Sequence, residues 1–295
     1  MDFLRSINPI WVTLAPILLV NLYFGVTIFI FMRLRKKRNW QLPEYLKNRA
    51  SSRFLNITIR HWWFWQMKPA TELFVRLRFT PNMLTMIGFL INCLAAFFFA
   101  KGLFGYGGWC VAFGSTFDMF DGYVAKFTNQ GTRSGAFFDS VMDRFSEGVV
   151  FLGLAFYFRN SWVSAFVIAG LIGGMLVSYT RARGEVLGID VSKVGSMQRA
   201  ERVVYICVSG ILEPVTTYVS HFWWAHPLPI FVMAAACLVG VMANATAVYR
   251  MVYIMNALDK ADRRGSETIP QILTQLGTKE GREQFWEKRR NDKSA

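Results

Sequence analysis

Seven apolar stretches, each close to the length of a bilayer crossing, dominate this chain. A helix needs about 20 mainly apolar residues to span the hydrocarbon core of a membrane. With 53% hydrophobic and 16% aromatic residues, the composition lies far from the average soluble domain. The sequence therefore predicts an all-α polytopic membrane protein. The expected spans are residues 10–32, 84–100, 106–125, 149–158 with its flanks, 162–179, 203–219 and 228–258.

The loops between these spans alternate between basic and nearly uncharged. The first span is followed by RLRKKR at 33–38, and basic residues recur after the third and fifth spans. The other loops hold Lys101, Arg159 or no basic residue. Cytoplasmic loops carry the excess of Lys and Arg. We therefore expect a multi-pass protein of the cell membrane, with the N-terminus outside and the C-terminal tail inside.

Charge and aromatic residues divide the rest of the chain. The stretch HWWFW at 61–65 is typical of a segment at the bilayer surface. The net charge of +14 favours anionic lipid and an anionic substrate as partners, and no stacking motif or fold signature points to nucleic acid. The predicted segments are a membrane anchor with a basic stop (1–38), a juxtamembrane interfacial segment (39–75), a core (76–258) and a polar cytoplasmic tail (259–295).

Four aspartates interrupt the apolar pattern where two neighbouring spans meet. Asp118 and Asp121 lie three residues apart near the end of one span, and Asp139 and Asp143 lie four apart at the start of the next. Such spacings share a helix face, and a hairpin turning at 127–134 brings the two pairs together. Adjacent carboxylates at the membrane edge repel unless cations neutralise them. Hard cations prefer carboxylate oxygen, so the pattern predicts that the four aspartates bind Mg²⁺ or Mn²⁺. The alternative is that they are helix caps or solvated loop residues.

Two glycines stand beside these carboxylates. Gly122 and Gly135 weaken their helices unless something must approach the backbone closely. A flat or bulky ligand bound next to the metals would explain why glycine is present at both positions.

These residues together resemble the signature of the CDP-alcohol phosphatidyltransferase family. The matching positions are Asp118-x-x-Asp121-Gly122-x-x-Ala125-Lys126, then eight residues, then Gly135-x-x-x-Asp139-x-x-x-Asp143. The family usually carries arginine where this chain has Lys126, which keeps the charge but loses the bidentate fork. The resemblance covers about 76–258, including PNMLT at 81–85. It implies a six-helix transmembrane core, to which this chain adds one extra N-terminal transmembrane helix.

The resemblance also implies roles for single residues. Asp118, Asp121 and Asp139 would ligate the metal, as two ions, while Asp143 would contribute to the site and act as general base. The phosphatidyl donor would be CDP-diacylglycerol, an alcohol would attack its lipid-side phosphorus, and CMP would leave. The family further implies a homodimer. The positions implied for CDP binding are Gly122, Ala125, Lys126, Gly135, Asn82 and Thr85.

The identity of the acceptor rests on a basic segment at 178–204. Its four arginines, at the expected depth of the aspartates, form a ready receptor for a phosphate group. They are Arg181, Arg183, Arg199 and Arg202. The pattern is similar to the phosphatidylinositol-phosphate and archaetidylinositol-phosphate synthases, so inositol phosphate is the predicted acceptor. Glycerol phosphate or another alcohol is the alternative, and the positive-inside loop alone accounts for part of this charge.

A divalent-cation transporter is the alternative from a different class. Transporters tend to place ion sites near the midplane, where internal repeats meet. The sequence shows no second acidic cluster and no repeat. The pattern therefore favours the enzyme, which unlike a transporter should bind CMP or CDP in a metal-dependent way.

Overall fold

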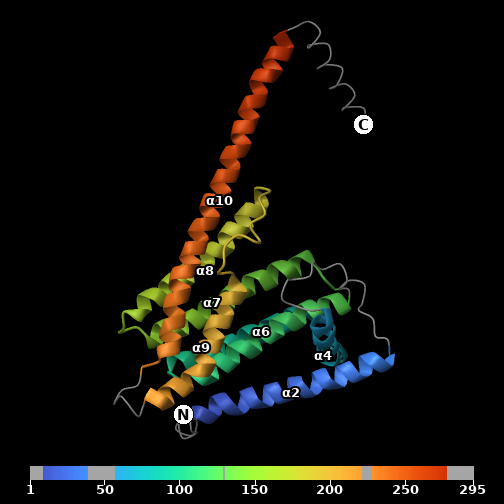
Figure 1. Cartoon of the computed structure of the whole chain (residues 1–295), viewed down its shortest axis with the longest axis vertical. Coiled ribbons are helices and arrows are strands. Elements are labelled where there is room, and N and C mark those ends of the chain that lie inside the picture. Colours follow the sequence, from blue (N-terminus) through green and yellow to red (C-terminus); the bar gives the residue numbers. More distant parts are fainter. Residues whose placement is uncertain (1–8, 39–56, 129, 221–227, 278–295) are drawn as a thin grey trace.

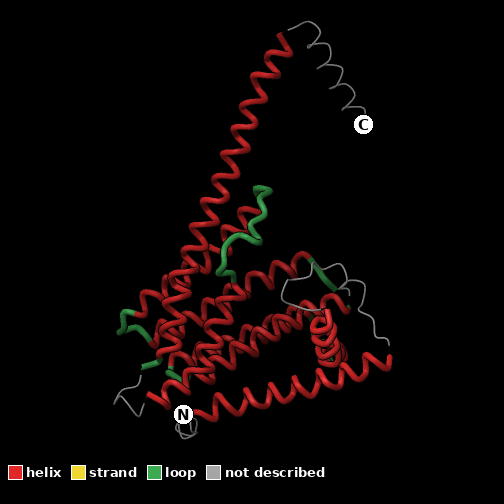
Figure 2. The backbone as a smooth tube through the Cα atoms, in the orientation of Figure 1, coloured by secondary structure: helices red, strands yellow, loops and turns green. Residues whose placement is uncertain are grey.

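The computed structural model describes residues 9–38, 57–128, 130–220 and 228–277, which form helices joined by loops and contain no strand (Figure 2). In chain order, the helices are α2 (Pro9–Arg38), α4 (Ile57–Arg76), α5 (Pro81–Ala100), α6 (Phe104–Phe127), α7 (Arg133–Tyr157), α8 (Val163–Val186), α9 (Arg199–Ser220) and α10 (Ile230–Gly277). Figure 1 shows α5 to α9 gathered into a bundle from which α10 projects.

Five of the described helices are long and apolar enough to cross a membrane: α2, α5, α8, α9 and α10. The helices α6 and α7, which carry the four aspartates, lie outside this group. The five apolar helices and the absence of strands among the described residues confirm the prediction of an all-helical membrane protein. The count of seven crossings stays a prediction.

Threonine caps fix where two helices of the bundle begin. The Thr80 hydroxyl accepts the Met83 N–H at 3.3 Å, and Pro81 follows as the first residue of α5. At the start of α7, the Thr132 hydroxyl accepts the Gly135 N–H at 3.0 Å. Side-chain oxygens at this position satisfy backbone donors that have no partner within the helix. The caps thus fix the starts of α5 and α7, whose second turns carry Thr85 and Asp139.

Small residues let the helices of the bundle approach closely. A Cβ at Gly108 of α6 would lie 2.5 Å from the Ile211 nitrogen of α9. A Cβ at Gly153 of α7 would clash with the Ala96 carbonyl oxygen of α5. Without a hydrophobic drive between helices in lipid, such close backbone packing is a main source of association. The packed core draws on α5 to α10 and includes Ala95, Phe99, Val111, Phe151, Leu154, Val167, Ile206 and Val239.

A buried carboxylate joins α9 to the start of α10. Glu213 is completely buried, and its Oε2 accepts the Val232 N–H at 2.7 Å. A negative charge at a helix N-terminus is favourable because the first backbone N–H groups point at it. The α10 helix then runs unbroken past residue 258, where the sequence analysis ended the core, to Gly277. The rest of the predicted tail lies outside the described residues.

The N-terminal helix packs against α4 and α9. Trp62 Nε1 of α4 donates to the Thr27 hydroxyl of α2 at 3.3 Å. The rings of Phe31 and Trp65 lie 5.7 Å apart, and Phe31 is almost fully buried. These contacts join α2 to α4, which occupies the second half of the predicted interfacial segment, and α2 also packs directly against α9. Residues 39–56 of that segment lie outside the described part of the chain.

Candidate functional site: a carboxylate cluster between α6 and α7

Three of the four aspartates gather at the end of the α6–α7 hairpin. Asp118, Asp121 and Asp139 each offer an oxygen, and these oxygens lie within 4.8 Å of one another. Two come from the last turns of α6 and one from the second turn of α7. The hairpin therefore brings together carboxylates that belong to different helices.

Asp121 is held by the first turns of α5. The Thr85 hydroxyl donates to Asp121 Oδ2 at 2.6 Å, and the Asp121 side chain is only 6% exposed. The same hydroxyl lies 3.1 Å from the Pro81 carbonyl oxygen of its own helix, so its single proton is shared between two acceptors, with the shorter bond to Asp121. Short hydrogen bonds to a carboxylate are strong and directional. Thr85, which the sequence analysis assigned to CDP binding, thus orients one carboxylate of the cluster.

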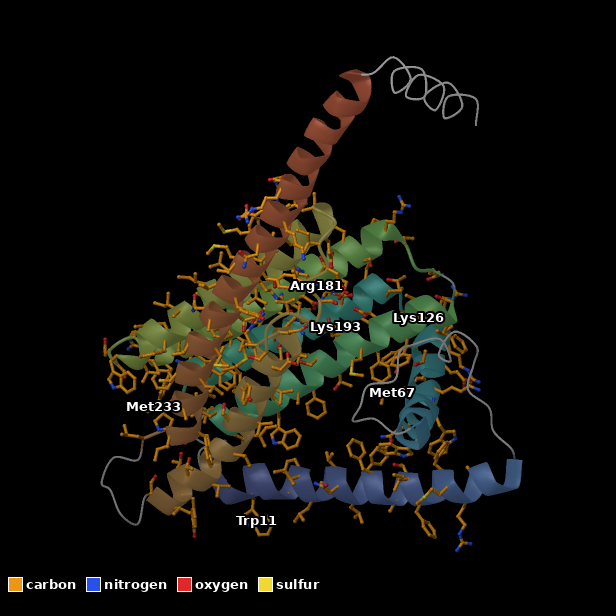
Figure 3. The ribbon with its side chains drawn as sticks, turned by 45° about the horizontal axis from the view of Figure 1, so that its top comes forward. Trp11, Met67, Lys126, Arg181, Lys193 and Met233 are labelled. Carbon is orange, nitrogen blue, oxygen red and sulfur yellow. The ribbon has the colours of Figure 1, made fainter. Side chains whose placement is uncertain are left out.

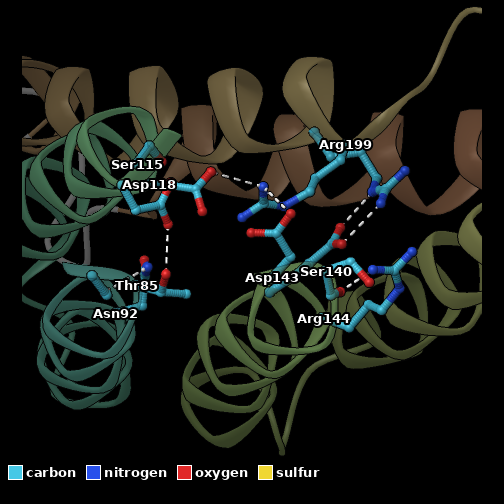
Figure 4. A network of polar contacts seen from close by, with 12 residues as sticks. Thr85, Asn92, Ser115, Asp118, Ser140, Asp143, Arg144 and Arg199 are labelled. Carbon is cyan, nitrogen blue, oxygen red and sulfur yellow. Dashed lines mark hydrogen bonds and ion pairs between the residues drawn. The ribbon is translucent and has the colours of Figure 1, made fainter. Parts of the chain in front are cut away.

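Asp143 lies beside this cluster and is joined to it by an arginine. Arg199 Nη1 lies 2.6 Å from Asp143 Oδ2 and 3.1 Å from Asp118 Oδ2. Figure 4 shows the Arg199 side chain between the two carboxylates, which come from α7 and α6. The start of α9 is therefore tied to both helices of the hairpin.

The cluster has more acceptor capacity than its protein partners use. Asp139 Oδ1 and Asp143 Oδ1 are buried and have no hydrogen-bond partner within the described part of the chain. A buried carboxylate oxygen left unpaired is costly. Converging carboxylates with free oxygens are the donor set that hard divalent cations prefer. The residues present therefore fit a divalent cation.

Glycines leave room on one side of the cluster. A Cβ at Gly122 would meet nothing within 4 Å, so packing within this chain does not require a glycine there. Across the hairpin, a Cβ at Gly135 would lie 3.4 Å from Asn82 Oδ1. Ala125 is half-buried and Lys126 is exposed. Among the described residues, Gly122, next to Asp121 in the chain, thus faces open space, and Gly135 lies close to Asn82; the assignment of these positions to CDP binding stays a prediction.

The four arginines of the predicted acceptor site do not converge. Arg199 reaches the aspartates, whereas Arg181 and Arg183 are exposed, and Arg181 Nε pairs with Glu185 of its own helix at 3.0 Å. Arg202 is completely buried, where its Nη2 lies 2.8 Å from Glu147 Oε2 and its Nε bonds the second oxygen. Of the four, Arg199 alone has a recorded contact with the aspartates among the described residues.

Three buried polar residues that contact Arg202 or the loop between α8 and α9 were not identified from the sequence: Glu147, Thr246 and Arg250. Glu147 follows Asp143 by four residues, and the same helix-face argument that paired the aspartates could have found it. Arg250 lies in the last apolar run, where an ionisable residue is a signal by itself, and Thr246 lies one helical turn before it. Arg250 is 1% exposed and contacts the loop between α8 and α9.

Comparison with known proteins agrees with this geometry. Residues 78–258 match the family model described as CDP-alcohol phosphatidyltransferase. The archaetidylinositol phosphate synthase of Methanothermobacter thermautotrophicus is 30% identical over 198 residues, covering 65% of this chain and 94% of that protein. The phosphatidylinositol phosphate synthase of Cutibacterium acnes is 31% identical over 202 residues, covering 67% and 96%.

Solved structures show the same fold. The phosphatidylinositol phosphate synthase of Mycobacterium tuberculosis with CDP-DAG bound superposes with a TM-score of 0.55 and 28% identity. That match covers 63% of this chain and 92% of the other. A structure of the same enzyme in complex with manganese and citrate also has a TM-score of 0.55, with 28% identity over 63% of this chain and 88% of the other. With its aspartates, its fold and 181 of its residues (78–258) matched, this chain belongs to the CDP-alcohol phosphatidyltransferase family and is a transferase of phospholipid synthesis.

Proposed function

We propose that this membrane enzyme transfers the phosphatidyl group of CDP-diacylglycerol to inositol phosphate and releases CMP. The observation that carries the proposal is the carboxylate cluster of Asp118, Asp121 and Asp139, with Asp143 and Arg199 directly beside it. The names of the similar synthases support the choice of both substrates. Because the family is one of transferases, the divalent-cation transporter is set aside.

The reaction replaces the phosphoanhydride bond of the donor with a phosphoester bond to the acceptor. The acceptor hydroxyl attacks the lipid-side phosphorus, the bond from that phosphorus to the CMP oxygen breaks, and Asp143 takes the hydroxyl proton. Divalent ions, which we propose to be two Mg²⁺ or Mn²⁺, supply charge stabilisation for the diphosphate and the departing phosphate. Asp118, Asp121 and Asp139 would hold them. Thr85 keeps Asp121 in place for this purpose through its 2.6 Å hydrogen bond.

The CDP moiety would lie on the side of the hairpin that the glycines leave open. Gly122 has free space where a Cβ would stand, and Gly135 faces Asn82 across from α5. Ala125 and Lys126 continue this side along α6, and the Lys126 ammonium can meet a phosphate as a point charge. A side chain larger than methyl at these positions would occupy the space proposed for the nucleotide.

The acceptor phosphate would bind next to Arg199. An arginine beside the aspartates can meet a phosphate with charge-assisted hydrogen bonds, which are among the stronger ones in proteins. We propose that Arg181 and Arg183 add positive charge from the end of α8. Arg202 is already engaged by Glu147, so it would contribute charge rather than a free guanidinium. Glycerol phosphate remains the second candidate acceptor.

The orientation in the membrane follows from where the basic residues lie. Figure 3 shows Lys126, Arg181 and Lys193 toward the end from which α10 projects, and Trp11 and Met233 toward the opposite end. Basic residues mark the cytoplasmic side. We therefore propose a cytoplasmic active site with the N-terminus outside, and a homodimer as the assembly.

The first prediction identifies the acceptor. Purified protein with CDP-diacylglycerol and Mg²⁺ or Mn²⁺ is expected to release CMP with inositol phosphate and to do so poorly with free inositol, which lacks the group that Arg199 would bind. Mass spectrometry of the lipid product checks this, with glycerol phosphate assayed in parallel. Equal use of inositol and inositol phosphate would rule out the proposed acceptor and leave the transferase chemistry standing.

The second prediction concerns Arg199. Arg199→Gln is expected to raise the acceptor KM by about 10- to 100-fold, since a hydrogen bond to a charged group is worth about 1.5 to 3 kcal/mol. The Kd for CDP-diacylglycerol should stay within about twofold, because its proposed ligands lie on α5, α6 and α7. Arg159→Gln is the matched control, since Arg159 is exposed and follows the opposite end of α7. An unchanged acceptor KM in Arg199→Gln would remove Arg199 from the acceptor site.

A further inference from the structure

The loop between α8 and α9, residues 187–198, is tightly packed although it contains no helix. Val191 is completely buried and Met197 is 3% exposed. The Ser192 N–H donates to Asp190 Oδ1 at 2.8 Å, a hydrogen bond that lowers the pKa of Asp190. The Gln198 side chain donates to the Ser192 carbonyl at 3.0 Å. A loop that served only to retain positive charge on one side would need none of these contacts.

Two side chains of α10 form hydrogen bonds with the main chain of this loop. The Thr246 hydroxyl accepts the Met197 N–H at 3.2 Å. Arg250 Nε donates to the Val194 carbonyl at 2.8 Å, and its Nη1 donates to the Val177 carbonyl of α8 at 2.9 Å. Thr246 and Arg250 are four residues apart, so they share one face of α10. That face therefore binds both the loop and the helix that precedes it.

The fit around Thr246 is close as well as polar. Gly195 has a φ of +86°, which glycine adopts readily. A Cβ at Gly195 would clash with the Thr246 methyl group. Thr246 is 3% exposed. The loop thus meets α10 through both the hydroxyl and the methyl of one threonine.

Met197 is held from two directions. The Thr246 hydroxyl accepts a hydrogen bond from the Met197 N–H, and Arg202 Nη1 donates to the Met197 carbonyl at 3.2 Å. Arg202 in turn is anchored on α7 by Glu147. Both polar groups of one peptide residue are therefore fixed by side chains from α10 and α9. Met197 lies two residues before Arg199, so these bonds fix the position of the backbone that leads into Arg199.

We infer that Thr246 and Arg250 are positioning residues for the transfer reaction, holding the α8–α9 loop so that Arg199 reaches Asp118 and Asp143. This rests on the proposed role of Arg199 beside the acceptor. Neither residue touches the reacting groups in this role. A side chain as long as arginine delivers its guanidinium within a few tenths of an ångström only when its backbone is fixed, and a site that is slightly loose loses much of its rate.

Thr246→Val tests the inference, because valine keeps the shape of threonine and removes the acceptor of the Met197 N–H. Amide exchange of the peptide covering 190–198 is expected to rise by about two- to tenfold, the value of one net hydrogen bond. The acceptor KM is expected to rise by a similar factor. The Kd for CDP-diacylglycerol with Mn²⁺ should stay within about twofold, since the residues proposed to bind it lie on α5, α6 and α7 and not on the loop.

Two further variants separate positioning from general stability. Thr246→Ser keeps the hydroxyl and is expected to restore both the exchange rate and the acceptor KM toward wild type. Thr71→Val is the matched control, because Thr71 is 4% exposed and its hydroxyl donates to Met67 within its own helix. Its acceptor KM should equal that of wild type.

Three outcomes would overturn the inference. The first is unchanged exchange at 190–198 in Thr246→Val. The second is an acceptor KM that stays at the wild-type value, or a Kd for CDP-diacylglycerol that rises as much as the acceptor KM. The third is a serine variant as impaired as the valine variant. If wild type does not use inositol phosphate, the proposed acceptor fails, and the same comparison is made with glycerol phosphate while the exchange measurement stands independently.

Discussion

Asp121→Asn is expected to abolish CMP release, with a loss of more than about 100-fold. Replacing a residue that merely orients a metal ligand already costs about 10- to 100-fold, and Asp121 would be a ligand itself. The asparagine keeps the size of the side chain but removes the negative charge that a divalent cation needs. CMP release and Mn²⁺ binding by titration calorimetry are the measurements. Asp118→Asn and Asp139→Asn should behave in the same way.

Two comparison variants make this result specific. Thr85→Val leaves the charge of Asp121 in place but removes the hydroxyl that donates to it at 2.6 Å. It is expected to lose about 10- to 100-fold in activity, between wild type and Asp121→Asn. Glu72→Gln, which removes a partly exposed acid of α4 that pairs with Lys68, should have wild-type activity. Full activity in Asp121→Asn would refute the metal site.

The carboxylate cluster was readable from the sequence because its geometry is mostly local. Asp118 and Asp121 share a helix face by their spacing alone, and the short polar turn keeps the start of α7 near the end of α6, while both helices pack against α5. The structure gathers oxygens of Asp118, Asp121 and Asp139 within 4.8 Å. The family signature then assigned roles that geometry by itself could not.

The different environments of the arginines could not be predicted from the sequence. Arg199 and Arg202 lie three residues apart in one basic segment, and the sequence treats them alike. In the structure Arg199 is partly exposed at the aspartates, while Arg202 is completely buried against Glu147, 55 residues away. Which of two neighbouring arginines turns inward depends on packing between α7 and α9. That information is non-local, so charge counting does not contain it.

Helix α10 shows a second limit. Its apolar run predicted a span ending at 258, but the helix continues to Gly277, because a change from apolar to polar residues ends the membrane segment and not the helix. The same run hid Arg250 and Thr246, whose partners are main-chain atoms of a loop about 50 residues earlier. Hydropathy averages over such residues and gives no indication of what they bind.

Asp143→Asn is expected to lower turnover by about 100-fold or more while CDP-diacylglycerol still binds. The loss is the scale of a missing general base. Asp143 is outside the group of three whose oxygens converge, and it contacts Arg199 at 2.6 Å instead. The asparagine oxygen can still accept from Arg199, so the arginine should stay in place. What the variant removes is the ability to accept the proton of the attacking hydroxyl.

The measurements that separate this role from metal binding are the Kd for CDP-diacylglycerol in the presence of Mn²⁺ and the rate of CMP release. For Asp143→Asn, the Kd should stay within about threefold of wild type and the rate alone should fall, whereas Asp121→Asn should lose both. Arg199→Gln should differ from each by raising the acceptor KM. If Asp143→Asn weakened binding of the CDP-lipid as severely as Asp121→Asn, Asp143 would be a ligand with no separate role as base. Another group would then have to accept the proton of the acceptor hydroxyl. The assignment of metal binding to the three converging aspartates and of the general base to Asp143 would be wrong.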